Sequence, residues 1–365
     1  MTKIKDILNY LEDFAPLSNQ EDYDNAGLIV GDRNRDLTGI VICLDSTEEV
    51  IQEAIDHRCN LVIAHHPIIF RGLKKITGQT YVERTIIKAL KNDISIYALH
   101  TNLDNIKEGV NKKICDLLKI RDPKILLPKS GSMMKLVTFI PREKTLQVLD
   151  AVHQAGAGSI GDYDHCSFRV LGTGRFRPNE EANPHIGEKN KMEEVIEDRV
   201  EVIFPDFRKN EVISALFRTH PYEEVAYYLH ELANESSEIG SGMIGYLDAD
   251  LEPIEFLKYL KRNMQLDWIK YANTNKPTIK KVAVCGGAGS FLLSRAIMEG
   301  ADALITADFR YHDFFEGEGN IMIVDIGHYE SEQFTTGIFY DLLIKNFPTF
   351  AVHLTEVNTN PVNYY

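Results

Sequence analysis

Three short apolar segments of this chain run directly into residues that commonly bind metal ions. The segments cover residues 60–64, 94–99 and 321–327, and they are followed by His65 and His66, by His100 and Asp104, and by His328 and Glu332. Each segment has the length and composition of a strand buried in a parallel sheet. Because ligands bind beyond the carboxyl ends of such strands, we expect these side chains to converge on one metal centre.

The spacing of these residues suits two divalent ions. His328 and Glu332 are four residues apart at the start of a predicted helix and therefore share a face. Adjacent histidines at a strand exit can splay, so that His65 and His66 each hold a different ion. Imidazole and carboxylate together favour zinc, iron or manganese. The sequence thus predicts two divalent metal ions bound by His65, His66, Asp104, His328 and Glu332, with residual positive charge for an anionic substrate.

Other polar residues near these strand ends have two interpretations each. His100 is expected to support the ligands or contact substrate rather than bind metal. Asp24 and Asn25 either orient ligands or substrate, or form a turn. Asp308 and His312 are four residues apart after an apolar strand, and they either exchange protons with a substrate or make structural hydrogen bonds.

Two further patterns also leave alternatives open. Gly286 and Gly287 belong to a GGAG segment between a predicted strand and helix, where a phosphate could bind or the chain could simply turn. Four residues in the middle of the chain suit either a second metal site or packing within the fold: His165, Cys166, His220 and Glu223.

The order of predicted elements indicates an α/β core interrupted by an inserted domain. Strands and helices alternate over residues 1–127 and again over 246–365, so we predict one discontinuous metal-binding core made of two similar α/β halves. Residues 128–245 instead show the order β-α-β, β-α-β, which is typical of an α+β ferredoxin-like domain.

Composition restricts the class of protein. The net charge of −14 makes nucleic acid an unlikely partner, since phosphate binding needs clustered Lys and Arg. No segment has the apolar length of a membrane span. The five cysteines form no CxxC pair, which disfavours a zinc ribbon or a disulfide framework. These features predict a cytoplasmic protein.

Several motifs together resemble one known family, the GTP cyclohydrolase I type 2 homologue or Nif-three-like family. The motifs are DNAGLIVG (24–31), HHPIIF (65–70), HTNLD (100–104), GGAG (286–289), TADFRYHD (306–313) and GHYESE (327–332). Tyr23 and Ala307 depart from the family pattern, which often has Trp and Gly there, but neither is a ligand position. The middle segment is similar to the PII/CutA-like insertion of longer bacterial members, on the motifs GAGSIGDYDHCSF (156–168) and HPYEEVAYYL (220–229).

The resemblance implies the same five metal ligands that the strand ends indicate. It also implies a homohexameric ring with the metal sites facing an inner cavity, and a ring-opening reaction on GTP. Under this implication we expect His312 to transfer protons.

Two functions fit the ligand set. In the first, the protein is a metal-dependent hydrolase in which metal-bound hydroxide attacks a small anionic substrate, such as a nucleotide. In the second, it is a non-enzymatic protein that binds or delivers metal, or senses a metabolite through its inserted domain. A turnover assay discriminates between them, because both need the same five ligands.

Overall fold

The computed structural model describes residues 2–364 and divides the chain into two compact units. The α/β unit comprises Met1–Pro128 with Glu238–Tyr365, and the inserted unit comprises Lys129–Ser237. The sequence predicted boundaries after residues 127 and 245. The second boundary differs because the Gly- and Ser-containing segment that suggested a linker belongs to a long strand, β10 (Glu235–Leu251), which pairs with β12 (Ile279–Ala288).

The first sheet of the α/β unit has the strand order β1-β4-β3-β2-β15. Its strands β4, β3, β2 and β15 are parallel, and β1 runs antiparallel along the edge. The strands are β1 (Gly27–Val30), β2 (Ile40–Cys43), β3 (Leu61–Ala64), β4 (Ser95–Ala98) and β15 (Val352–Leu354). Strands β2, β3 and β4 are buried throughout, which explains their continuous apolar sequences.

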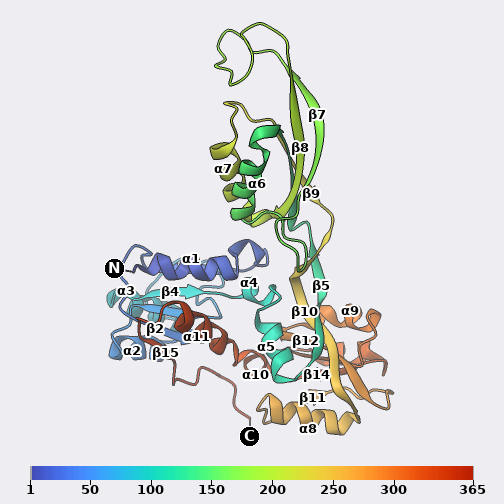
Figure 1. Cartoon of the computed structure of the whole chain (residues 1–365). Helices are drawn as coiled ribbons and strands as arrows, with labels where there is room; N and C mark the ends of the chain where they lie inside the picture. Colours follow the sequence, from blue (N-terminus) through green and yellow to red (C-terminus); the bar gives the residue numbers. More distant parts are fainter. Residues whose placement is uncertain (1, 365) are drawn as a thin grey trace. The chain divides into compact units, whose positions relative to one another are not determined.

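Helices connect and cover these strands (Figure 1). Helix α2 begins after Thr47, whose side chain accepts a hydrogen bond from the Val50 amide, and α3 begins after Thr80 in the same way. The helices of this half are α1 (Ile4–Phe14), α2 (Glu48–Asp56), α3 (Tyr81–Lys91), α4 (Thr101–Asp104) and α5 (Val110–Leu117).

The second sheet has the strand order β11-β14-β13-β12-β10-β5. Strands β12, β13 and β14 are parallel, and β11 is antiparallel to β14, as β1 is to β4 in the first sheet. The remaining elements are β5 (Arg121–Ser130), β11 (Lys270–Tyr271), β13 (Ala303–Ala307), β14 (Met322–Asp325), α8 (Pro253–Asn263), α9 (Leu293–Met298), α10 (His328–Glu332) and α11 (Thr335–Asn346). This confirms a mixed α/β protein with several sheets.

One hydrophobic cluster contains side chains from both sheets. Leu61 of β3 and Tyr97 of β4 belong to it together with Val284 of β12, Ile305 of β13 and Val324 of β14. All five are essentially inaccessible to solvent. This shared core keeps the two sheets together, and the residues that follow β3, β4 and β14 therefore reach one common site.

The inserted unit contains a sheet with the strand order β7-β8-β6-β9, whose described pairings are antiparallel. Along the chain its elements are β6 (Met133–Pro141), α6 (Thr145–Gln154), β7 (Phe168–Phe176), β8 (Glu193–Pro205), α7 (Lys209–Thr219) and β9 (Tyr227–Leu232). The two helices pack on the sheet through a separate hydrophobic cluster that includes Val148, Phe204 and Leu216.

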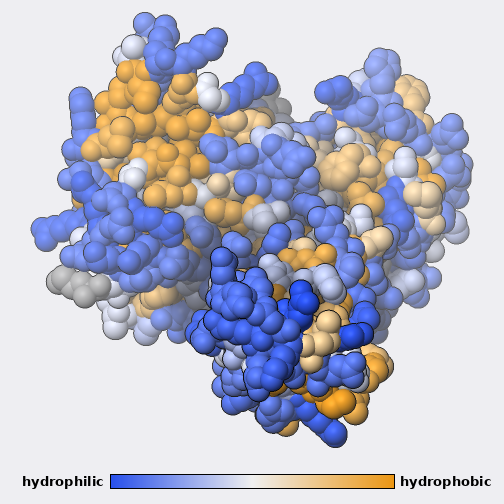
Figure 2. All heavy atoms as spheres, turned by 90° about the horizontal axis from the view of Figure 1, so that it is seen from above, coloured by the Kyte–Doolittle hydropathy of each residue, from blue (hydrophilic) through white to orange (hydrophobic). Residues whose placement is uncertain are grey.

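The surface is mainly hydrophilic, but hydrophobic side chains gather in patches on the face shown in Figure 2. Exposed large apolar residues include Phe168 and Val170 of β7. None of the described helices combines the length and apolar character that crossing a bilayer requires.

Candidate metal centre

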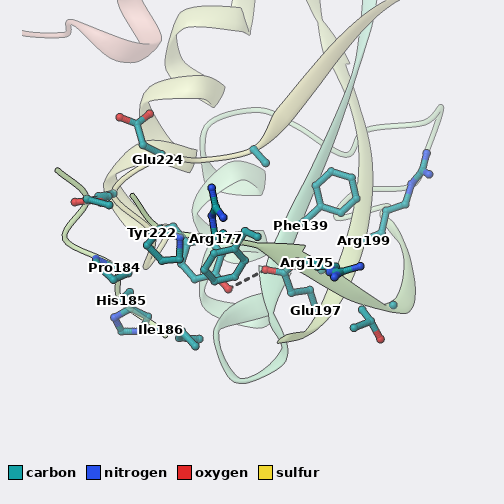
Figure 3. Close-up of a pocket in the computed structure, with 18 of the residues that line it drawn as sticks. Phe139, Arg175, Arg177, Pro184, His185, Ile186, Glu197, Arg199, Tyr222 and Glu224 are labelled. Carbon is teal, nitrogen blue, oxygen red and sulfur yellow. Dashed lines mark hydrogen bonds between the residues drawn. The ribbon is translucent and has the colours of Figure 1, made fainter. Parts of the chain in front are cut away.

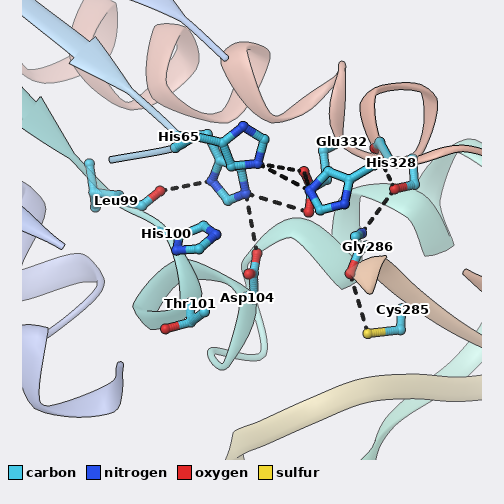
Figure 4. A network of polar contacts seen from close by, with 12 residues as sticks. His65, Leu99, His100, Thr101, Asp104, Cys285, Gly286, His328 and Glu332 are labelled. Atoms are coloured by element: carbon cyan, nitrogen blue, oxygen red, sulfur yellow. Dashed lines mark hydrogen bonds and ion pairs between the residues drawn. The ribbon is translucent and has the colours of Figure 1, made fainter. Parts of the chain in front are cut away.

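A buried glutamate is surrounded by the three histidines that the sequence selected (Figure 4). Glu332, in α10, places Oε1 3.7 Å from the Nε2 atom of His65. Its other oxygen, Oε2, lies 3.0 Å from Nε2 of His66 and 3.2 Å from Nε2 of His328. Asp104 Oδ1 lies 3.6 Å from Nε2 of His65. The structure thus brings all five predicted ligands together.

The donor atoms fit a cation. His65 Nε2 and Asp104 Oδ1 are buried and have no hydrogen-bond partner among the described residues, which is costly unless something else binds them. The ligand atoms of His65, His66 and Glu332 all lie within 4.8 Å of one another. This buried group could hold a metal ion, and its nitrogen and carboxylate donors suit a transition metal.

The three imidazoles are held in the orientation that metal binding requires. Nδ1 of His65 lies 2.8 Å from the Leu99 carbonyl oxygen, which can only accept a hydrogen bond. Nδ1 of His66 lies 2.8 Å from Asp45 Oδ1, and Nδ1 of His328 lies 2.7 Å from Asp308 Oδ2. When each Nδ1 donates to its oxygen, each Nε2 faces the centre with its lone pair free for a cation.

Asp45 is a functional residue that the sequence analysis missed. It follows β2 by two residues, so it stands at a strand end like the residues that were selected. The carboxyl-end rule applied to every apolar strand would have found it.

The pKa values of the two carboxyl groups in the centre are shifted in opposite directions. Burial, and then repulsion by the Glu332 carboxylate, raises the pKa of Asp104 to about 8. Burial also disfavours a charged Glu332, but His65, His328 and His66 around it lower its pKa well below the usual range. Without a cation, the Asp104 carboxyl group therefore favours its protonated form at neutral pH, and Glu332 favours its charged form.

The two outer histidines favour the protonated form when no cation is present. Burial alone would lower their pKa values. Hydrogen bonds to Asp45 and Glu332 nevertheless raise the pKa of His66 to about 9, and bonds to Asp308 and Glu332 raise that of His328 to about 11. A metal ion that binds here therefore displaces protons.

Gly287 makes room for the glutamate, and Gly286 makes room for Val110. A Cβ atom at Gly287, which has φ +60°, would lie 2.4 Å from Glu332 Oε1, and one at Gly286 would lie 2.7 Å from Val110 Cγ1. Their amides already donate to Asn111 Oδ1 and Ser331 Oγ. Gly286 and Gly287 therefore lie in β12 where neighbouring side chains approach the backbone closely, and neither of these amides is free to bind a phosphate.

A cavity of about 560 Å³ adjoins the centre. His66, His100 and His328 line it on one side, and Trp268 and Tyr364, whose ring centroids are 4.5 Å apart, line another. Trp268 is the only tryptophan of the chain, and the sequence analysis did not select it.

The C-terminal segment forms part of this cavity. Asn360, Pro361 and Val362 line it, and the neighbouring Thr359 hydroxyl donates to Asp45 Oδ2 at 2.9 Å. The segment therefore contacts the carboxylate that orients His66. No sequence pattern indicated this, because the contact joins residues that are 314 positions apart.

The remaining predicted residues take different places. His100 lines the cavity, and its Nδ1 lies 2.7 Å from Asp24 Oδ1. Asn25 is exposed and donates to the Ile69 carbonyl. Asp308 lines the cavity and orients His328. His312 is exposed, packs against Tyr311 and Phe315, and does not line the cavity. Its catalytic role stays a prediction.

The alternative metal site of the inserted unit is not assembled. Both ring nitrogens of His220 are engaged by backbone groups, Nε2 with the Phe139 carbonyl and Nδ1 with the Tyr222 amide. Among the described residues, the only three or more His, Cys, Asp or Glu side chains whose ligand atoms lie close enough together to share one ion are His65, His66 and Glu332. These contacts fit the role of His220 in packing within the fold rather than in a second metal site.

Replacing Gly287 by Ala is expected to damage both stability and metal binding. Positive φ costs an alanine about 1–2 kcal/mol, and the new Cβ would displace Glu332. Gly300 is the matched control, since it has φ +71° but open space around it. Urea unfolding should show a lower free energy of unfolding in both Gly287→Ala and Gly300→Ala. Elemental analysis should show less bound metal only in Gly287→Ala. Equal metal content in the two variants would contradict the close-approach role.

Replacing Asp24 by Asn is expected to change the pH dependence of stability. Burial opposes the charge of Asp24, but hydrogen bonds from His100 and Thr101 lower its pKa to about 2. A carboxylate with a lowered pKa stabilises the fold above its unfolded pKa of about 4, and this contribution disappears as the pH falls towards 2.

Asp24→Asn should therefore lose on the order of 1–2 kcal/mol of unfolding free energy at pH 7. The difference in unfolding free energy between Asp24→Asn and the unaltered protein should disappear between about pH 4 and pH 2. Urea unfolding of chelator-treated protein measures this, with the exposed Asp22→Asn as control. A gap that stays constant down to pH 2 would exclude the charged hydrogen bonds as its cause.

Comparison with known proteins identifies the family of this chain. The profile of the Duf34/NIF3 (NGG1p interacting factor 3) family matches residues 2–361. The chain is 40% identical over 364 residues to the GTP cyclohydrolase 1 type 2 homolog of Halalkalibacterium halodurans, covering 98% of each chain. It is 36% identical to that of Bacillus subtilis, covering 98% of this chain and 97% of the relative.

A solved structure shows the same fold. A Bacillus cereus protein related to NIF3 is 33% identical and superposes with a TM-score of 0.88, covering 100% of this chain and 99% of that one. The family that the sequence motifs indicated is therefore confirmed. By sequence and by fold, the chain belongs to the Duf34/NIF3 family.

Proposed function

We propose that this protein is a dinuclear metal-dependent hydrolase that acts on a small anionic molecule, such as a nucleotide. The observation that carries the proposal is the position of the Glu332 carboxylate between two sets of donors. Oε1 faces His65, which also faces Asp104. Oε2 faces His66 and His328. This arrangement supports one ion on each side of a bridging carboxylate.

Each of the two ions would be held by its own set of side chains. His65, Asp104 and Glu332 Oε1 would hold one ion, and His66, His328 and Glu332 Oε2 the other. Divalent ions in such a pair lower the pKa of a coordinated water and polarise the bond to be cleaved. Asp45 and Asp308 keep the outer imidazoles in place through their Nδ1 atoms.

The cavity beside the centre supports an anionic substrate. Trp268 and Tyr364 form part of its wall, and Lys270, whose Nζ lies 5.6 Å from the centroid of the Trp268 ring, adds a positive charge that is shared with Asp325 at 2.7 Å. His100, held by Asp24, presents its imidazole to the same space and is placed to exchange a proton with a bound substrate.

Metal content should test the bridging arrangement. Protein purified without chelators is expected to carry about two ions per chain, and His65→Ala and His328→Ala about one each, because each removes a ligand of one ion only. Glu332→Ala should lose both ions. Elemental analysis of the folded variants measures this. His57→Ala is the control, since His57 stacks on His353 away from the centre.

One ion per chain in the unaltered protein, or the same content in His65→Ala and His328→Ala as in the control, would contradict the dinuclear arrangement. Circular dichroism of each variant separates loss of ligand from loss of fold.

Turnover should then test the catalytic role. Protein loaded with zinc, iron or manganese is offered GTP, phosphate esters and amides, and at least one is expected to be hydrolysed. His65→Ala should abolish turnover, and His100→Ala should lower kcat by about 10²–10⁴-fold. His312→Ala should leave kcat unchanged, given its exposed position. No turnover with any metal would reject the hydrolase, and a loss confined to His312→Ala would restore that residue as the proton donor.

A second candidate, metal delivery, is favoured by the unequal exposure of the histidines. The side chain of His65 is fully buried, whereas those of His66 and His328 are 21% and 39% exposed. An ion on the exposed side could exchange with an acceptor. Rapid transfer to an apo acceptor, together with flat turnover assays, would support delivery in place of hydrolysis.

We also propose that the inserted unit is a ferredoxin-like domain of the PII/CutA-like type. Its element order β6-α6-β7-β8-α7-β9 and sheet order β7-β8-β6-β9 support this assignment. The homohexamer and the cytoplasmic location expected from the sequence stay predictions.

A further inference from the structure

The inserted unit contains a second cavity, of about 980 Å³, that the metal chemistry does not use (Figure 3). All its lining residues belong to the inserted unit. They come from β6, from most of β7 and the loop that follows it, from β8, and from β9 and the segment before it. Its volume is at the upper end of the range for cavities that enclose a small organic ligand.

A buried carboxylate forms part of the cavity wall. Glu197 of β8 is only 6% exposed, although it lines the cavity. Its Oε1 accepts a hydrogen bond of 2.8 Å from the Tyr222 hydroxyl. Burial and the neighbouring Glu197 carboxylate raise the pKa of Tyr222, so its hydroxyl stays protonated and donates. The described hydrogen bonds include none to Glu197 Oε2, so this oxygen can accept from a ligand.

A glycine on the adjacent strand leaves room for this carboxylate itself. Gly172 of β7 is the strand partner of Glu197. A Cβ atom at Gly174, two residues along, would clash with Glu197 Oε2. Both glycines line the cavity. Any larger residue at 174 would displace the carboxylate.

Arginines supply positive charge around the same space. Arg175, Arg177 and Arg199 line the cavity (Figure 3). Arg199 forms an ion pair with Glu201 at 2.9 Å. Arg175 lies 4.0 Å from Glu194, which is the longest distance at which the two can pair. Arg177 makes no hydrogen bond or ion pair within residues 2–364, so its guanidinium is available to an anionic group.

Aromatic rings complete the lining. The ring of Tyr222 lies 6.1 Å from Phe176 and 6.4 Å from His185, and Phe139 lies 5.9 Å from Tyr228. Rings arranged in this way offer faces on which a flat heterocycle can stack. The cavity therefore combines a buried acceptor, an available guanidinium and stacking surfaces.

We propose that this cavity binds a guanine mononucleotide. The guanine N1–H and its exocyclic amino group are adjacent donors that one carboxylate can accept together, and adenine has no such pair. Glu197 would recognise the base, and Arg177 with Arg175 would bind the phosphate. Glu181, Glu223 and Glu224 also line the cavity, which disfavours the higher charge of a triphosphate.

Isothermal titration of the full chain with guanosine monophosphate tests the proposal. Chelator-treated protein is used, so that the metal centre contributes nothing to the heat. One saturable site per chain is expected, with adenosine monophosphate and GTP binding about tenfold more weakly. Arg177→Gln and Glu197→Gln should each weaken binding about tenfold or more. Arg142→Gln and Glu211→Gln, both exposed in the inserted unit and outside the cavity, are matched controls.

The metal-ligand variant His65→Ala separates this site from the centre and should bind guanosine monophosphate unchanged. The proposal is overturned if millimolar nucleotide gives no binding, if Arg177→Gln binds as tightly as its control, or if His65→Ala abolishes binding. Because Arg177 is exposed, its replacement should not affect folding, and it keeps the test valid if Glu197→Gln is unstable.

Discussion

The buried carboxylate of Glu332 is the constraint on which the rest of the α/β unit depends. It is 2% exposed, and its two oxygens face three imidazoles, two of which follow β3 and one of which follows β14. A carboxylate in this position is tolerated only because positive or polarised groups surround it completely. The glycine at 287, the short helix α10 and the core shared by both sheets all serve to bring it there.

The same constraint explains the ring of polar partners around the centre. His65 is oriented by a backbone carbonyl, while His66 and His328 are oriented by carboxylates. The buried histidine thus uses a neutral acceptor, and the two more exposed histidines use charged ones. Charged partners make an imidazole a stronger base, so the outer histidines bind protons tightly and exchange them for a cation.

The inserted unit also contains a buried glutamate, but with different neighbours. There the carboxylate of Glu197 is held by a tyrosine hydroxyl rather than by imidazoles, and arginines line the surrounding cavity. Guanidinium groups do not act as metal ligands, because they are donors without a free lone pair. The candidate metal centre and the cavity of the inserted unit therefore favour different ligands, although each contains a buried glutamate.

The sequence by itself determined the α/β alternation, the five candidate ligands that the structure brings together, and the family, because buried strands and the residues at their carboxyl ends are local patterns. Only the tertiary structure decided how Glu332 divides its oxygens, and that Asp45, Trp268 and the C-terminal segment belong to the site. It also decided that His312 faces solvent and that residues 238–245 belong to the α/β unit. Those outcomes depend on contacts between residues far apart in the chain, and the spacing of residues within a segment carries no information about them.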